Sequence, residues 1–160
     1  MRHAAILLGL TLAGLAMHAQ AAEPVQKGAA MTARGTFDVK VTPQPPDDSA
    51  AGPFQRLFLD KQFHGDLEAG SKGQMMGAQS AVEGSGAYVA FEQVTGALNG
   101  RKGSFMLQHR GTMRKGSYLM DVTVVPDSGT GELAGIAGTM TIVIEGGKHS
   151  YAFEYRLEGE

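Results

Sequence analysis

The chain has no cysteine and no tryptophan among its 160 residues, and aromatic residues make up only 7% of it. Without cysteine no disulfide can cross-link the fold, so the stability of the protein must come from a packed core. Lysine and arginine number 14 against 16 acidic residues. This balance leaves no basic face to neutralise a phosphate backbone, and we predict no nucleic-acid partner.

Long apolar runs are missing after the first segment. Residues 1–21 start with a positive charge at Arg2, continue through an apolar run over residues 4–17, and end at Ala21 in the small-residue pattern of a signal-peptide cleavage site. The run is shorter than the roughly 20 apolar residues that a membrane-spanning helix needs. We predict cleavage after Ala21, a periplasmic or secreted protein, and no membrane span.

The rest of the chain is long enough for one domain with its own core. Residues 22–31 are predicted to be a flexible N-terminal segment, and residues 32–160 to form a single domain. Four prolines fall within residues 43–53, where their missing amide donors exclude a central strand and a helix. This stretch is predicted to be a surface loop, either a solvated connection or a lid over a binding mouth.

Apolar residues recur at every second position through most of the domain, and Gly, Asn, Asp or Pro interrupt them at short intervals. This alternation predicts antiparallel β-strands, and no long helical stripe competes with it. The predicted strands are residues 35–41, 55–64, 73–80, 88–98, 103–113, 117–125, 139–145 and 150–157.

Short turns connect several of these strands. Asn99 and Gly100 both tolerate the positive φ of a type I′ turn and predict a tight hairpin, and residues 114–116 and 146–148 predict two more. A sheet of about eight short hairpins tends to close, because closure removes its exposed edges. We therefore predict an all-β fold, a single antiparallel barrel of about eight strands, with a two-sheet sandwich as the alternative.

Six blocks of the sequence together resemble the DUF3224 family of bacterial proteins. The most specific parts of this resemblance are Phe-Met-Leu-Gln-His at residues 105–109 and Val-Val-Pro-Asp-Ser-Gly-Thr-Gly-Glu-Leu at residues 124–133. The resemblance implies a β-barrel similar to those of plant allene oxide cyclases and, more distantly, dirigent proteins, which hold small apolar or aromatic molecules in the lumen. The family has no established activity to carry over. The blocks are residues 35–40, 59–68, 88–96, 103–109, 124–140 and 147–155.

One stretch imitates a cofactor motif. Residues 129–134 satisfy the G-x-G-x-x-A dinucleotide fingerprint and follow an apolar strand. That fingerprint requires a helix directly afterwards, but Gly135 and Gly138 interrupt any helix there, and residues 139–144 form a β-branched strand. We predict a structural turn with close backbone approach, and no cofactor.

Two residues are candidates for acid–base chemistry. His109 alternates with Phe105 and Leu107, so all three face one side of their strand. A desolvated histidine there can exchange protons near neutral pH, or it can be a structural hydrogen-bonding residue. Glu92 lies in an apolar run that would raise its pKa, so it is a catalytic candidate; otherwise it faces solvent or pairs with a neighbour such as Arg110.

The mature histidines do not form a metal motif. His64, His109 and His149 are about 40 residues apart and show none of the usual ligand spacings. We predict no metal site, and we expect His149, beside a glycine turn, to be exposed.

Three functions are compatible with these features. The first is a non-enzymatic exported barrel that binds a small apolar or amphipathic molecule. The second is an isomerase or cyclase in which His109 or Glu92 moves a proton. The third is a structural barrel, solid inside, that forms a homo-oligomer through its outer face. The residues predicted to line the ligand are Phe63, Phe105, Leu107, His109 and Tyr155.

Overall fold

The computed structural model describes residues 29–45 and 54–158, and every regular element in these ranges is a β-strand. The predicted signal peptide, most of the predicted flexible segment and residues 46–53 of the predicted loop lie outside the described residues. Within the described ranges there is no helix that is long and apolar enough to span a membrane. The strands are β1 (Met31–Pro43), β2 (Phe54–Gly65), β3 (Leu67–Gln79), β4 (Gly86–Leu98), β5 (Arg101–Arg114), β6 (Ser117–Val124), β7 (Thr130–Gly131), β8 (Ala137–Glu145) and β9 (Lys148–Arg156).

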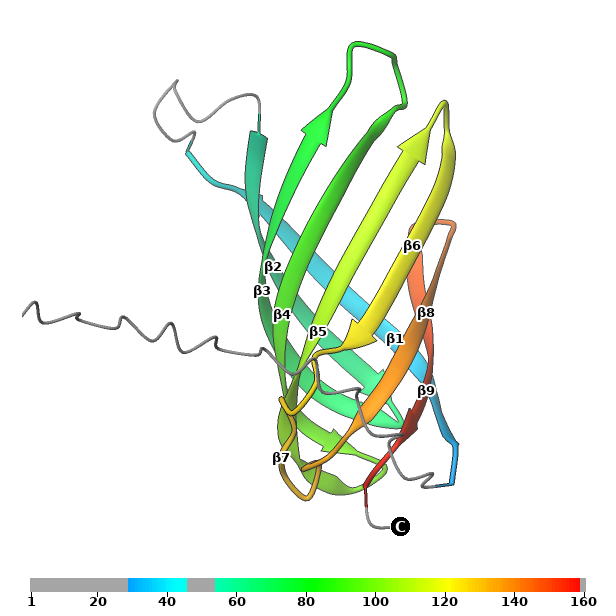
Figure 1. Cartoon of the computed structure of the whole chain (residues 1–160). Helices are drawn as coiled ribbons and strands as arrows, with labels where there is room; N and C mark the ends of the chain where they lie inside the picture. The colour runs from blue at the N-terminus through cyan, green and yellow to red at the C-terminus, as the bar shows by residue number, and fades with distance from the viewer. Residues whose placement is uncertain (1–28, 46–53, 159–160) are drawn as a thin grey trace, which may run out of the picture.

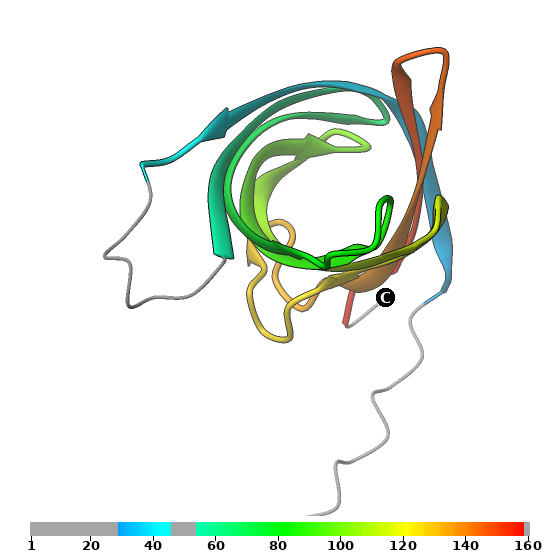
Figure 2. The ribbon, with the colours of Figure 1, turned by 90° about the horizontal axis from the view of Figure 1, so that it is seen from above.

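Eight of these strands form a closed ring (Figure 1). Neighbouring strands pair antiparallel in the order β1-β2-β3-β4-β5-β6-β8-β9, and β9 pairs with β1 to close the sheet. The short β7 adds to β5 outside this order through Gly103–Gly131 and Ser104–Thr130. Figure 2 shows the strands encircling one central axis. The predicted eight-stranded barrel is therefore confirmed, and the sandwich is excluded.

Alternation of buried and exposed side chains defines the inner wall. In β5, for example, Phe105, Leu107 and His109 are buried and the residues between them are exposed. Two predicted strand starts were wrong: β1 begins at Met31, and β3 begins at Leu67 rather than at residue 73. The start of β3 alternates small and polar residues, which have a low preference for strands. Its pairing with β2 and β4 on either side stabilises the strand there.

The predicted tight turns are confirmed. Asn99 and Gly100 have φ angles of 49° and 83°, and they connect the directly paired ends of β4 and β5. Residues 115–116 and 146–147 also have positive φ and connect β5 to β6 and β8 to β9 in the same way. These two-residue turns match the natural twist of the strands, which is why consecutive strands become neighbours in the ring.

The barrel is sealed at one end, which we call the closed end. The connection between β6 and β8 places Leu133 and Ile136, 1% and 2% exposed, in the same core as Phe105 and Phe153. A Cβ atom on Gly129 would lie 2.0 Å from the carbonyl oxygen of Leu133, so this close approach requires glycine. The glycine-rich segment is thus a structural turn, as predicted, and it covers the barrel end.

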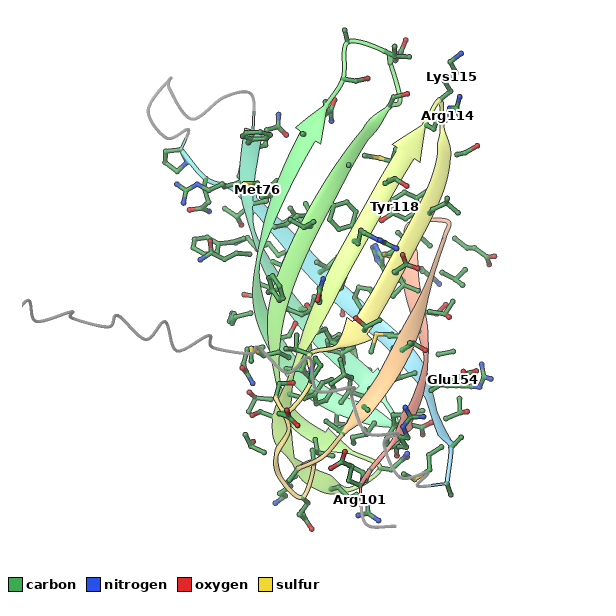
Figure 3. The ribbon with its side chains drawn as sticks, in the orientation of Figure 1. Met76, Arg101, Arg114, Lys115, Tyr118 and Glu154 are labelled. Carbon is green, nitrogen blue, oxygen red and sulfur yellow. The ribbon has the colours of Figure 1, made fainter. Side chains whose placement is uncertain are left out.

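The opposite end, which we call the open end, is built differently. It contains the β5–β6 hairpin tip with Arg114 and Lys115, whereas Arg101 lies at the closed end (Figure 3). Inward-facing apolar side chains at the open end remain partly or well exposed. The partly exposed ones are Val39, Leu57, Met75, Tyr88, Met113, Met120 and Ile142, and the exposed ones are Val41, Tyr118 and Ile144.

Candidate functional site

A cluster of four polar side chains lies on the inner wall of the barrel, which we call the inner polar cluster. Lys61, Ser71, Glu92 and His109 come from β2, β3, β4 and β5, and each is between 1% and 6% exposed. They are the buried polar or charged residues of the part of the chain that the structure describes. Charged groups this deep are costly to desolvate unless they are paired, and here they pair with one another.

Glu92 is the centre of the inner polar cluster. Its Oε1 accepts hydrogen bonds from Lys61 Nζ and His109 Nε2, each at 2.9 Å, and its Oε2 accepts one from Ser71 Oγ at 2.9 Å. Lys61 Nζ also lies 4.9 Å from the centre of the Phe37 ring. The carboxylate therefore holds the imidazole and the ammonium group in fixed positions.

Strand register brings these residues together from distant parts of the sequence. Lys61 is paired with Ser71, and Glu92 with Gly73, across adjacent strands. A Cβ atom on Gly73 would lie 2.7 Å from the Cβ of Glu92, so glycine leaves the space in which the Glu92 side chain sits. His109 then meets Glu92 diagonally, from the next strand, because its direct partner is Ala90.

The pKa of Glu92 was predicted to be raised, and this prediction was wrong. Burial does raise it, but the hydrogen bond from His109 and the charge of Lys61 outweigh burial and lower the pKa to about 2. The predicted alternative of a partner in Arg110 was also wrong, because Arg110 faces outward and pairs with Asp121. Strand alternation places the two residues on opposite faces of the wall.

The ionised carboxylate fixes which nitrogen of the His109 ring carries the shared proton. Since Glu92 Oε1 can only accept, the Nε2 atom of His109 must carry a proton. The Nδ1 atom has no protein partner among the described residues, although every fully enclosed side-chain nitrogen or oxygen there has one. Nδ1 is therefore not sealed off, and it is the ring nitrogen that a bound molecule could meet.

The other histidines lie apart from this cluster. His64 is on the outer side near Asp38, with its Nε2 3.5 Å from a carboxylate oxygen. His149 is half-buried and packs on Phe37 with ring centres 4.9 Å apart, so the prediction that it is exposed was wrong. In the described ranges no group of three or more His, Cys, Asp or Glu residues is arranged to hold a metal ion.

The other predicted lining residues all face inward but lie deep in the core. Phe63, Phe105 and Leu107 are fully buried, and Tyr155 is 3% exposed. The hydroxyl of Tyr155 accepts a hydrogen bond from Asn99 Nδ2 at 2.8 Å, which ties it to the turn of the closed end. Their contact with a ligand remains a prediction, whereas His109 is the member of the set in the inner polar cluster.

Sequence reasoning missed Lys61, Ser71 and the tyrosines of the open end. The signal for Lys61 was present, because it alternates with Leu59 and Phe63 in a predicted strand and so had to share their face. A lysine is usually assigned to the surface, and the apolar residues on either side of it were the indication to the contrary.

Two tyrosines interact above the inner polar cluster at the open end. The hydroxyl groups of Tyr88 and Tyr118 lie 2.7 Å apart, and Figure 3 shows Tyr118 on the upper part of β6. A Cβ atom on Gly111 would lie 2.0 Å from the Tyr88 ring, so Tyr88 lies across this glycine. Burial, followed by the hydrogen bond that Tyr88 shares with Tyr118, raises the pKa of Tyr88, and the charge of Glu92 contributes in the same direction.

The wall of the barrel is weakly paired between β6 and β8. These strands pair at one position, Thr123 with Thr139, whereas the other ring neighbours pair over long stretches. A hollow of about 270 Å³ lies along this seam, and one of its lining residues, Val122, is the register partner of His109. The inward-facing residues that line it are Tyr118, Met120, Val122, Met140 and Ile142.

Larger hollows lie on the outer wall, away from the inner polar cluster. One of about 460 Å³ crosses β1, β2 and β3 and contains the exposed ion pair of Lys72 and Asp60. Its polar groups are solvated and satisfied on the surface, so it offers little binding energy to a polar ligand. We therefore place the candidate site inside the barrel, where desolvated charges meet apolar walls.

These features define an eight-stranded antiparallel barrel with a charged cluster on its inner wall. The model of the DUF3224 family, described as a protein of unknown function, matches residues 33–155, and the chain belongs to this family. A crystal structure of a DUF3224 protein of unknown function from Shewanella oneidensis MR-1 is 48% identical, covers 81% of this chain and 98% of its own, and superposes with a TM-score of 0.75. No curated protein matches the chain.

Proposed function

We propose that this protein is exported and binds a small apolar or amphipathic molecule at the open end of the barrel. The supporting observation is the exposure of inward-facing apolar side chains there, such as Tyr118 at 44% and Ile144 at 55%. The closed end buries equivalent side chains under Leu133 and Ile136. Apolar surface left in contact with water forgoes about 25 cal/mol per Å² of stabilisation, and concave surfaces that retain it are typical of ligand sites.

The seam between β6 and β8 supports an entry route and a limit on size. Its hollow of about 270 Å³ is slightly smaller than typical ligand pockets, which commonly enclose roughly 300–1,000 Å³. Opening this seam requires few hydrogen bonds to break, because the two strands pair at one position. A guest of modest size fits this geometry best.

Native mass spectrometry of the purified protein and thermal shifts against small apolar molecules test the proposal. We expect a retained mass or a stabilising shift in the wild type. Met113→Trp should fill the open end from the inner face of β5 and abolish the effect. Met106→Trp, on the outer face of the same strand, is the matched control and should leave it intact. A clean apo mass with no thermal shift for the wild type would contradict the proposal.

A second function, an isomerase or cyclase, is supported by one observation. The two predicted acid–base residues bond each other, with His109 Nε2 on Glu92 Oε1 at 2.9 Å, so the free Nδ1 can act as the base. The proton that Nδ1 removes from one carbon returns to another atom of the same molecule, and no co-reactant is needed. Glu92, ionised throughout, orients the imidazole and stabilises its charged form.

Isomerisation leaves the mass of a ligand unchanged, which makes the test specific. Molecules extracted from the wild type and from His109→Gln would be compared by chromatography coupled to mass spectrometry. An isomerase predicts two species of one mass whose ratio differs between the two proteins. Identical ratios, with ligand still bound to both, would leave binding as the function.

A further inference from the structure

The inner polar cluster has more hydrogen-bond donors than acceptors. Glu92 is its one carboxylate, and three donors already occupy the two oxygens. Lys61 carries three N–H groups, of which one meets an acceptor among the described residues. The remaining side of its ammonium group faces the rings of Phe37 and Phe63, at 4.9 and 5.7 Å from their centres.

His109 adds a second open position beside this ammonium group. Its Nε2 and Lys61 Nζ bond the same oxygen, Oε1 of Glu92, so the two basic side chains are held next to each other. The Nδ1 atom has no protein partner in the described part of the chain and is not fully enclosed. The histidine thus keeps one unpartnered hydrogen-bonding atom on the inner wall of the barrel.

The surroundings of these two groups are apolar. Val39 is the register partner of Lys61, and Ala90 and Val122 are the partners of His109 on either side. Val122 also lines the seam hollow between β6 and β8. A molecule that reaches the cluster must therefore carry an apolar body and only a small polar group.

We infer that the guest is an amphipathic acid whose ionised oxygen group accepts a hydrogen bond from Lys61 Nζ, and a second from His109 Nδ1 when that nitrogen carries a proton, while its apolar body lies among the side chains of the open end. This inference rests on the proposed function, because it names the class of molecule that the open end takes. An anionic oxygen supplies the acceptor that the cluster lacks. An ammonium or other cationic group would instead meet Lys61 directly and be repelled.

Three probes with the same eight-carbon chain test this charge preference: octanoate, octanol and octyltrimethylammonium. Their dissociation constants for the full-length mature protein would be measured by calorimetry. We expect octanoate to bind at least about tenfold more tightly than octanol, as a charge-assisted hydrogen bond in a desolvated site predicts, and the cation to bind most weakly.

Substitution of the lysine should remove the preference and leave the apolar contribution. Lys61→Met is expected to weaken octanoate at least about tenfold, to near the affinity of octanol, while octanol changes by less than about twofold. Lys72→Met is the matched control. This exposed lysine lies on the outer wall of the neighbouring strand, and its loss changes the net charge equally without touching the cluster.

Failure of the inference and failure of the proposed function give different results. If no probe binds and the native protein retains no molecule, the proposed function is wrong. If all three probes bind equally, or the cation binds best, the guest is not an acid and only this inference falls. Should Lys61→Met not fold, the double variant Lys61→Met/Glu92→Gln removes both charges together and must show the same loss of preference.

Discussion

At each end of the barrel a tyrosine ring lies across a glycine of the neighbouring strand, but the two rings are held in different ways. Tyr151 lies across Gly35 at the closed end, and Tyr88 lies across Gly111 at the open end; in each case the tyrosine and glycine are direct register partners. Tyr151 is 4% exposed, and its hydroxyl accepts a hydrogen bond from the backbone amide of Leu67 at 2.9 Å. The ring is thereby fixed to the adjacent turn.

The tyrosine of the open end, Tyr88, has no such anchor to the main chain of residues 29–45 and 54–158. Its hydroxyl meets the Tyr118 hydroxyl at 2.7 Å, and Tyr118 in turn donates to Met120 Sδ at 3.4 Å. Side chains bonded to other side chains can rearrange around a guest, whereas a bond to the backbone holds a ring in place. The comparison indicates that the closed end contributes more to the stability of the fold, and it is compatible with the proposed binding at the open end.

The largest expected difference between the ends is in stability. Phe153→Ala should lower the free energy of unfolding by about 3–5 kcal/mol, because the ring is fully buried and stacks on Phe105 and Tyr155. Met113→Ala, inward-facing but half-buried, should cost less than about 1 kcal/mol. Urea denaturation measures both. Equal losses would show that the open end is packed as tightly as the closed end.

The second largest effect on stability is expected for Glu92, whose carboxylate lies between the two ends. Glu92→Gln leaves Lys61 buried without its counter-charge and should cost about 3 kcal/mol at neutral pH. Lys61→Met/Glu92→Gln should recover part of this loss, because it removes both charges. Melting temperatures of the two variants against the wild type give the comparison, and a double variant less stable than the single one would contradict it.

The same carboxylate predicts a pH dependence. Its pKa in the folded protein, about 2, lies below the ordinary value, so its stabilisation is complete above about pH 4.5 and is lost as the pH falls towards 2. Wild-type stability should therefore decline between about pH 4.5 and pH 2 more steeply than that of Glu92→Gln. Parallel slopes for the two proteins in urea titrations at each pH would exclude this role.

Substitutions in the turns of the two ends are expected to have smaller effects on stability. Asn99 and Lys115 both have φ of 49°, but asparagine tolerates this conformation and also donates to the Tyr155 hydroxyl. Asn99→Ala should cost about 1–2 kcal/mol, whereas Lys115→Asn should gain a few tenths of a kcal/mol. Thermal unfolding would rank the three proteins, and a stabilised Asn99→Ala would contradict the assignment.

The smallest effect on stability is expected on the outer wall. Phe58 and Phe91 face outward, about half exposed, on either side of Gln74 in the register. We expect Phe58→Ser/Phe91→Ser to change stability by less than about 0.5 kcal/mol and to reduce self-association, which exposed apolar patches promote. Light scattering over a concentration series tests this. A wild type that stays monomeric at high concentration would remove the basis for an oligomer.

Alternation and turn chemistry predicted most of the fold because both are local. The strand around His109 and the Asn99–Gly100 turn were identified from neighbours a few residues away, and so was the inward direction of His109. The candidate site could be predicted only in part. Glu92 was a candidate with its side unassigned and the wrong sign of pKa shift, since its partners come from strands before and after its own.

The sequence by itself determined an all-β fold, its hairpin turns and the side of the strand on which His109 lies, because these depend on period-two alternation and on residues that accept positive φ. Tertiary structure alone decided that β9 pairs with β1 to close the barrel, that Lys61, Glu92 and His109 meet, that residues 125–136 seal one end, and that the β6–β8 seam stays weakly paired. Each of these depends on register between strands that are far apart in the chain, and no local preference encodes that register.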